Sequence, residues 1–198
     1  MCGRLVHMLT PEGYATYLDL SVPETEPNWD VRPTDPLPVI RQQGGRLECA
    51  LLRWGFASRA GKVLFNARSE TVAELPSFRD AYRRCRALVF ASGWYEWKDK
   101  QRYLVRRKDD KPVVMAALWQ GDRFTILTCA AGDDLAWLHQ RVPVVLERRH
   151  WQGWLRAEPA GEWLRPFPTG ALAALGPRCE TGFPEPTAPG ALVLPRRG

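Results

Sequence analysis

The C-terminal half of the sequence contains three closely spaced segments in which apolar and polar residues alternate. The segments cover residues 102–108, 113–120 and 123–129, and two short polar turns, Asp109-Asp110 and Gly121-Asp122, separate them. Alternation with a period of two is typical of strands with one buried face, and such short turns join antiparallel neighbours. The pattern therefore predicts an antiparallel meander over the three segments, and with it a core built mainly from sheet.

Shorter strands are predicted on both sides of the meander. They cover residues 5–8, 37–41, 47–56, 63–65, 87–90 and 144–146, with Gly44-Gly45 as the hairpin turn between the second and the third. Short helices are predicted from Pro11 to about Asp19 with Thr10 as N-cap, over residues 77–84 with Ser77 as N-cap, from Asp133-Asp134 onward, and over residues 149–155. Residues 28–34 are expected to form a connecting loop.

The chain is expected to form one domain over residues 1–198. Its 198 residues suffice for one sizeable core, and the sequence contains no internal repeat and no second boundary. The core is expected over about residues 1–155. Residues 156–198 are rich in Pro and Gly, so the tail around Arg196-Arg197 is expected to be disordered.

Several classes of protein are disfavoured by the cysteines and by the apolar segments. The five cysteines are scattered, and no two have C-x-x-C spacing, so neither a zinc site nor a disulfide framework is expected. No cofactor and no metal are predicted. The N-terminus lacks an apolar secretion segment, and no apolar run approaches about 18 residues, so a membrane span is not expected. We therefore expect a cytoplasmic protein with free thiols.

The charge and the tryptophans suggest a polyanionic partner. The net charge is +6, and nine Trp residues supply rings for a core or for stacking surfaces. Arg83, Arg84 and Arg86 surround Cys85. Such a cluster is most often a solvated face, although phosphate contacts are made from the same residues.

Cys2 follows the initiator Met1, and removal of Met1 would leave two adjacent nucleophiles. These are a thiol with a pKa of about 8.5 and an α-amine with a pKa of about 7.7–8.0. A 1,2-aminothiol reacts with an aldehyde to give an imine, which the thiol closes to a thiazolidine. The alternative is that Cys2 has no role, and the first residues taken alone favour it.

Three polar residues stand at the ends of apolar runs, where a side chain can be fixed for chemistry. Asn66 follows residues 63–65, Glu96 lies among aromatic residues, and His139 closes a predicted helix. Aromatic surroundings can raise the pKa of Glu96 and suit a general acid, but an exposed edge-strand Glu is an equal alternative. A lone His is more often structural than catalytic.

Six motifs in order resemble the SRAP (SOS-response-associated peptidase) family, whose members crosslink to abasic sites in single-stranded DNA. They are Cys-Gly-Arg at residues 2–4, Asn-Ala-Arg-Ser-Glu at 66–70, Gly-Trp-Tyr-Glu-Trp at 93–97, Ala-Leu-Trp at 117–119, Phe-Thr-Ile-Leu-Thr at 124–128 and His-Gln-Arg-Val-Pro-Val-Val-Leu at 139–146. The resemblance implies a single α+β domain with a curved, mostly antiparallel, barrel-like β-sheet, short peripheral helices and a basic groove for single-stranded DNA.

The resemblance also implies roles for individual residues. Cys2 would be the nucleophile, Asn66 would position it, Glu96 would be the acid/base group near the α-amine, and His139 would help to open the sugar and move protons. The DNA contacts carried over from the same motifs are Gly3, Arg4, Arg68, Trp94, Trp97 and Arg141. The implied partner is abasic single-stranded DNA, bound by a cytoplasmic monomer that is associated with the nucleoid when on DNA.

The sequence departs from the family pattern in two loops. Trp29-Asp30-Val31-Arg32-Pro33 stands where Tyr-Asn-Val-Ala-Pro is expected, and residues 58–61 replace a segment with a Trp that would unstack bases. Loop contacts with DNA therefore differ from the family pattern.

The leading hypothesis is covalent capture of abasic sites by Cys2 after Met1 is removed, with autoproteolytic removal as one route. The alternatives are a non-covalent single-strand binding protein, a thiol peptidase acting on proteins, and an inert structural domain.

Overall fold

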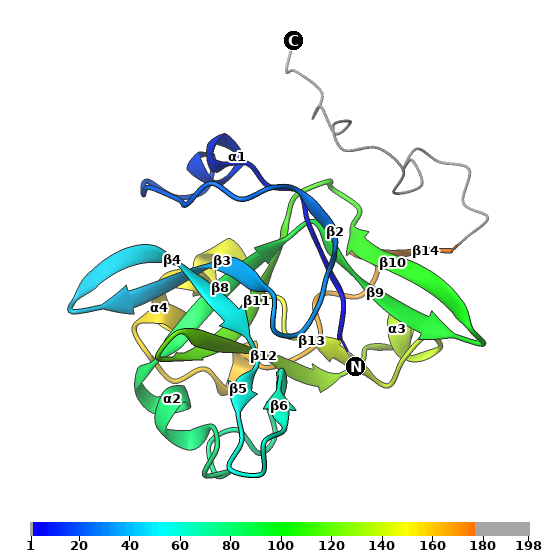
Figure 1. Ribbon diagram of the computed structural model, residues 1–198. Coiled ribbons are helices and arrows are strands. Elements are labelled where there is room, and N and C mark those ends of the chain that lie inside the picture. Colours follow the sequence, from blue (N-terminus) through cyan, green and yellow to red (C-terminus); the bar gives the residue numbers. More distant parts are fainter. Residues whose placement is uncertain (1, 177–198) are drawn as a thin grey trace.

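Two main β-sheets form the frame of the molecule in a computed structural model that describes residues 2–176 (Figure 1). The smaller has the strand order β14-β10-β9-β1-β2, and the larger has the order β11-β8-β3-β4-β12-β13, with β7 also paired to β12. Because β11 pairs with β12 as well, the larger sheet is curved and barrel-like. A small third sheet contains only β5 and β6.

The strands are short and most pairs are antiparallel; within residues 2–176, only β12 with β4 and β12 with β7 run parallel. Their bounds are β1 Leu5–His7, β2 Asn28–Val31, β3 Pro36–Gln43, β4 Arg46–Trp54, β5 Phe56–Ala57, β6 Val63–Leu64, β7 Asn66–Arg68, β8 Arg86–Ala91, β9 Gly93–Lys98, β10 Gln101–Arg107, β11 Val113–Gln120, β12 Arg123–Ala130, β13 Arg141–Pro143 and β14 Leu172–Leu175.

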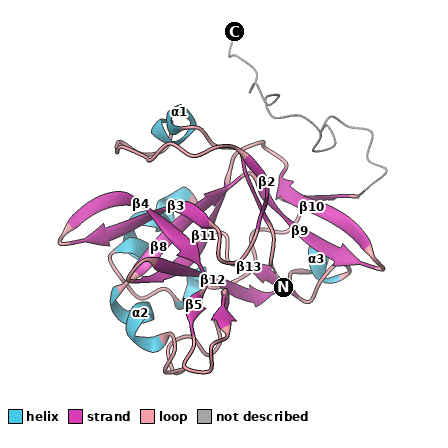
Figure 2. Cartoon of the chain, in the orientation of Figure 1, coloured by secondary structure: helices cyan, strands magenta, loops and turns pink. Residues whose placement is uncertain are grey.

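The helices are short and lie around the sheets (Figure 2). They are α1 Pro11–Ala15, α2 Arg79–Arg84, α3 Asp133–Ala136 and α4 Trp151–Leu155, with two 3₁₀ turns at Arg148–His150 and Gly161–Trp163. The prediction of an α+β fold on a curved, mostly antiparallel, barrel-like sheet is therefore confirmed. Within the described residues no helix is both long and apolar enough to span a membrane.

Helix boundaries follow the capping signals only in part. Thr10 caps α1 as predicted, since its Oγ1 accepts a hydrogen bond from the Gly13 N–H at 3.2 Å. However, α1 ends at Ala15 rather than near Asp19. The predicted Ser77 cap is wrong, because α2 starts after Phe78 and no side chain caps it.

The predicted meander is wrong in one of its two pairings. The β11–β12 hairpin forms around Gly121, but β10 pairs with β9 and β14 in the smaller sheet, whereas β11 pairs with β8. Between β10 and β11, ion pairs from Arg106 and Arg107 to Asp110 and Asp109 fold the turn. Pro112 follows this turn, and a strand continues only from Val113. The alternation correctly predicted strands at β10, β11 and β12, but it does not identify the strand with which each of them pairs.

Two segments expected to lie outside the sheets are strands. Residues 28–31 form β2, which pairs with β1, although the sequence predicted a loop there. β14 lies beyond residue 155 and pairs with β10 from Leu104 to Arg107. The smaller sheet therefore includes a strand from the Pro- and Gly-rich part. The expected disorder at Arg196-Arg197 falls outside the described residues.

The chain crosses from one sheet to the other at Ser92. All six residues of β8 are buried, as suits a strand at the centre of a core, and β9 begins immediately after Ser92. The Ser92 N–H donates to the Val6 carbonyl at 2.8 Å, and its Oγ accepts from the Met8 N–H at 3.2 Å. The crossing is thus fastened to β1, which fixes β9 relative to the first residues of the chain.

Gly93 allows this crossing because β10 passes very close to it. A Cβ at Gly93 would lie 2.5 Å from the Val105 carbonyl oxygen, a backbone atom that cannot move aside alone. Gly93→Ala is therefore expected to lower the free energy of unfolding by about 1–3 kcal/mol, the usual cost of overpacking, as measured by urea denaturation. Gly161→Ala is the control, because a Cβ there meets nothing within 4 Å. Equal stability of the two variants would contradict this account.

His7 has a partner that the sequence did not reveal. Its Nε2 lies 2.9 Å from the Tyr14 hydroxyl, and both side chains are buried. Burial lowers the pKa of His7 to about 4. The ring is therefore neutral at neutral pH and belongs to the packing between β1 and α1.

Candidate active site

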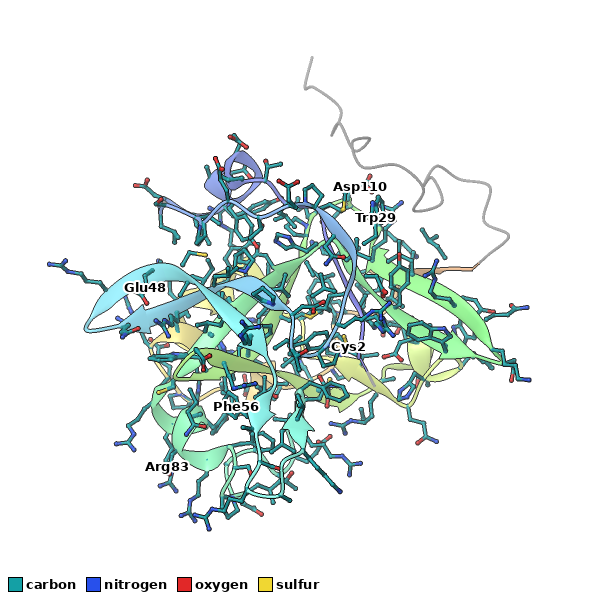
Figure 3. All side chains as sticks on the ribbon, in the orientation of Figure 1. Cys2, Trp29, Glu48, Phe56, Arg83 and Asp110 are labelled. Carbon is teal, nitrogen blue, oxygen red and sulfur yellow. The ribbon has the colours of Figure 1, made fainter. Side chains whose placement is uncertain are left out.

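Cys2 lies three residues before β1, near the centre of the molecule (Figure 3). Its side chain is fully buried. Strand β1 is held between β2 and β9, with Leu5 opposite Trp94, and the Tyr95 N–H donates to the Arg4 carbonyl at 2.9 Å. The residues next to Cys2 are therefore fixed from both sides.

Asn66 contacts Cys2 directly. Its Nδ2 donates a hydrogen bond of 2.7 Å to the Cys2 carbonyl oxygen. Asn66 is positioned by the parallel pairing of β7 with β12 and by the preceding Phe65 carbonyl, which accepts from the Trp54 Nε1 at 2.8 Å. The Asn66 Oδ1 is buried and has no hydrogen-bond partner among the described residues. The amide thus orients Cys2 and keeps one acceptor available.

Glu96 is a buried carboxyl close to Cys2. Burial raises its pKa from an ordinary value of 4.5 to about 6. Burial also raises the pKa of the Cys2 thiol well above its ordinary value, and the negative charge of Glu96 raises it further. The Cys2 sulfur also accepts a hydrogen bond from the Arg4 backbone N–H, which acts in the opposite direction. The thiol is therefore protonated at neutral pH, whereas the Glu96 carboxyl titrates at about pH 6.

His139 follows α3 and is held by the backbone of Arg141. Its Nδ1 lies 2.9 Å from the Arg141 nitrogen and 3.0 Å from the Arg141 oxygen, so this ring nitrogen has a backbone partner in either protonation state. Burial lowers the pKa of His139, and the positive charge of the amino terminus lowers it further. The same positive charge also lowers the pKa values of Cys2 and Glu96, but burial raises both and has the larger effect. The three groups thus share one electrostatic environment.

Arg4 is engaged by a carboxylate that the sequence analysis did not assign to it. Its Nη1 lies 3.0 and 2.9 Å from the two Asp30 oxygens, and Arg32 also contacts Asp30, at 2.7 Å. The charge of Asp30 was visible as a departure from the family motif. What the sequence could not show is that β2 pairs with β1 and brings Asp30 to Arg4.

Arg141 is engaged in a similar way by Glu70. Its Nη1 and Nη2 contact the two Glu70 oxygens at 2.6 and 2.9 Å, and the Nη2 also donates to the Thr128 carbonyl at 2.5 Å. Arg141 therefore ties β13 to the end of β7 and holds the loop that carries His139. Its contact with DNA stays a prediction, and Glu70 is a site residue that the sequence analysis left without a role.

The remaining predicted DNA contacts differ in exposure. Arg68 is exposed, Gly3 is half-buried, and the Trp97 side chain is 44% exposed. Trp94 is fully buried in the core, so its ring cannot stack on a nucleobase in this structure. Its predicted DNA contact is corrected to a packing role, because its strand partner is Leu5 of the buried β1.

The described residues also contain cavities, which lie apart from the candidate catalytic side chains. Two cavities of about 410 Å³ each are present, and none of Cys2, Asn66, Glu96 and His139 lines either of them. No group of three or more His, Cys, Asp or Glu side chains suited to a metal ion occurs between residues 2 and 176.

Comparison with known proteins gives consistent matches. A family model described as SOS response associated peptidase (SRAP) matches residues 1–175. The chain is 32% identical over 183 residues to the abasic site processing protein YedK of Escherichia coli, covering 82% of each chain. It is 29% identical over 160 residues to the abasic site processing protein YobE of Bacillus subtilis, covering 70% of this chain and 73% of that one.

Two solved structures have a similar fold. A protein from Bordetella bronchiseptica is 26% identical, with a TM-score of 0.78, and the match covers 88% of this chain and 99% of that one. A phage-related protein from the same organism is 26% identical, with a TM-score of 0.75 over 91% of this chain and 96% of that one. Because the family model covers nearly all of the described residues, the chain belongs to the SRAP family.

Proposed function

We propose that this protein recognises abasic sites in single-stranded DNA and captures the ring-opened aldehyde covalently through Cys2. The observation that carries the proposal is the hydrogen bond from Asn66 to the Cys2 carbonyl, with the Glu96 carboxyl acting on the same thiol. The curated relatives in the family are named abasic site processing proteins, which supports the choice of substrate.

The chemistry begins once Met1 has been removed and Cys2 has a free α-amine. The amine adds to the aldehyde, and the carbinolamine loses water to give an imine. The thiol then adds across the C=N bond: sulfur bonds to carbon, the sulfhydryl proton passes to nitrogen, and a thiazolidine results with one water released. Because amine and thiol belong to one fixed residue, the second step is intramolecular.

Proton transfers in this sequence have suitable donors and acceptors. Loss of water from the carbinolamine needs a general acid, and a Glu96 carboxyl with a pKa of about 6 is partly protonated near neutral pH. Ring opening of the abasic sugar needs a proton to move between two oxygens. We assign this to His139, whose lowered pKa keeps the ring neutral and able to accept a proton.

DNA contacts complete the proposal. Arg4 is two residues from Cys2 and Arg68 is two residues from Asn66, and both would bind the phosphates flanking the lesion. The exposed ring of Trp97 would stack on a base. Gly3 and Arg141 adjoin the same region. We further propose that one copy of the chain is sufficient, since all of these residues come from a single chain.

The direct test is to incubate the processed protein with a single-stranded oligonucleotide that carries one abasic site. The expected product withstands denaturation, and its mass is the sum of protein and oligonucleotide less one water. A complex that forms but dissociates on denaturation would instead identify a non-covalent binding protein. The same mass spectrum shows whether Met1 has been removed, and timed spectra of the purified chain would reveal autoproteolytic removal.

Asp30 is expected to weaken DNA binding, because it occupies Arg4 in the free protein. Asp30→Asn removes that negative charge, so we expect tighter binding to single-stranded DNA and a steeper salt dependence. One additional phosphate contact changes the slope of log K against log salt by about 0.7 for single strands. Fluorescence anisotropy across a salt series measures both quantities.

The matched control is Glu48→Gln, which makes the same change in net charge at an ion pair with Arg41 on the β3–β4 hairpin. Only Asp30→Asn should steepen the salt dependence. If both variants change binding equally, the effect is one of net charge and the competition between Asp30 and DNA is refuted.

A further inference from the structure

We propose that Trp137, with Tyr103 and Lys98, forms a stacking site for a nucleobase adjacent to the abasic sugar. This inference rests on the proposed function, because it extends the DNA path from Cys2 to a surface beyond Glu96. The partner is a base of the same single strand, and the site lies where β9, β10 and α3 meet.

Strand register places this surface next to Glu96. Tyr103 on β10 is the direct partner of Glu96 on β9, and Lys98 lies two positions further along β9. Side chains at alternate positions of a strand share a face, and direct partners do so too, so Glu96, Lys98 and Tyr103 lie on one face of the hairpin.

Trp137, which directly follows α3, packs onto that face. Its ring centroid lies 5.3 Å from that of Tyr103, with the rings nearly perpendicular at 85°. The indole Nε1 donates to the Asp134 carbonyl at 3.0 Å, which fixes the ring on its own helix. His139 follows two residues later, so one short segment carries both the stacking ring and a proposed catalytic group.

Exposure and charge favour a nucleotide as the occupant. The Trp137 side chain is 46% exposed although it is large and apolar. The Lys98 Nζ lies 5.2 Å from the Trp137 ring centroid and donates to the Trp137 carbonyl at 2.5 Å. An exposed aromatic ring with an ammonium group beside it offers a π-face to a base and a positive charge to its phosphate.

Distance supports the order of the subsites. Direct partners on neighbouring antiparallel strands have Cβ atoms about 5 Å apart. The Cβ atoms of Tyr103 and Glu96 are therefore one strand spacing apart. The Trp137 ring lies beyond Tyr103, with 5.3 Å between the two ring centroids. This separation suits a base attached to the nucleotide next to the abasic sugar.

The test measures affinity for short single strands that carry tetrahydrofuran, a stable mimic of the abasic sugar without the aldehyde. Trp137→Ala is expected to bind about ten-fold more weakly in fluorescence anisotropy, and Trp137→Phe, which keeps a ring, should retain most of the affinity. Two further oligonucleotides carry a second tetrahydrofuran in place of the neighbouring base on the 5′ or the 3′ side. On the strand that lacks the stacked base, Trp137→Ala and wild type should bind equally.

Comparing wild type and Trp137→Ala on these three strands separates the loss of a contact with one base from a general loss of protein structure. The inference is overturned if Trp137→Ala binds every strand as wild type does, or if it loses the same factor on all three strands. Trp119→Ala is the matched control, since it removes another ring under an arginine, Arg41 at 4.2 Å, on β11. Thermal unfolding of each variant checks the fold. Tetrahydrofuran cannot crosslink, so the result does not depend on whether Cys2 captures an aldehyde.

Discussion

Cys2→Ala is expected to abolish the complex with abasic DNA that withstands denaturation. Alanine in this position keeps an α-amine after Met1 is removed but has no thiol, so the reaction stops at a reversible imine. That imine hydrolyses on denaturation unless borohydride reduces it to a stable amine. We therefore expect no adduct without borohydride and a trapped adduct with it, measured by denaturing gel electrophoresis.

Cys85→Ala is the control for this result. Cys85 is a half-buried free cysteine at the end of α2, on the larger sheet. It should crosslink as the wild type does. If a stable adduct persists in Cys2→Ala without reductant, another residue is the nucleophile and the assignment of Cys2 is wrong.

Glu96→Gln is expected to slow crosslinking by about 10²–10⁴-fold, the usual contribution of a general acid. Because the α-amine, with a pKa of about 7.7–8.0, must be unprotonated and Glu96, with its pKa raised to about 6, must be protonated, the wild-type rate should rise with pH up to about 6 and then level off as the acid form is lost. Glutamine does not titrate, so the slower rate of the variant should continue to rise with pH up to about 8, without the levelling-off near pH 6. Single-turnover crosslinking rates between pH 5 and 8 would measure both effects. An unchanged profile in Glu96→Gln would remove this residue from the mechanism.

The same substitution should make the fold more stable above pH 6. A carboxyl whose pKa is higher in the folded state binds more protons there, so its contribution to stability is present below about 4.5 and is lost as pH rises through about 6. A shift of this size corresponds to about 2 kcal/mol. Urea denaturation at pH 8 should therefore show Glu96→Gln to be more stable than wild type, whereas Glu74→Gln, at an exposed position, should not change stability.

The local sequence pattern predicted which segments form strands better than it predicted which strands pair with one another. The segments that became β3, β4, β8, β10, β11 and β12 all carry the expected apolar pattern. Alternation reports that one face is buried, but it does not identify the partner strand, which is why β10 was placed beside β11. β2 was missed because its four residues include Asn and Asp, and only the pairing with β1 makes them extended.

The sequence predicted which residues belong to the candidate site, but not how deeply they are buried or which of them contact one another. Family motifs pointed to Cys2, Asn66, Glu96 and His139, and the structure joins Asn66 to Cys2 by a hydrogen bond. Motifs carry no information on burial, so Trp94 was taken for a DNA contact although it belongs to the core. The ion pairs of Asp30 with Arg4 and of Glu70 with Arg141 join segments far apart in sequence.

The position of β1 between β2 and β9 has a consequence for the order of events during synthesis. Cys2 is among the first residues made, but Asn66 lies 64 positions away along the chain, and β9 is made later still. Contacts between residues so distant in sequence form late, because a long loop must close first. A nascent chain therefore carries a cysteine with no neighbouring amide or carboxyl. The reactive centre is latent until the second half of the chain has been made and has folded around it.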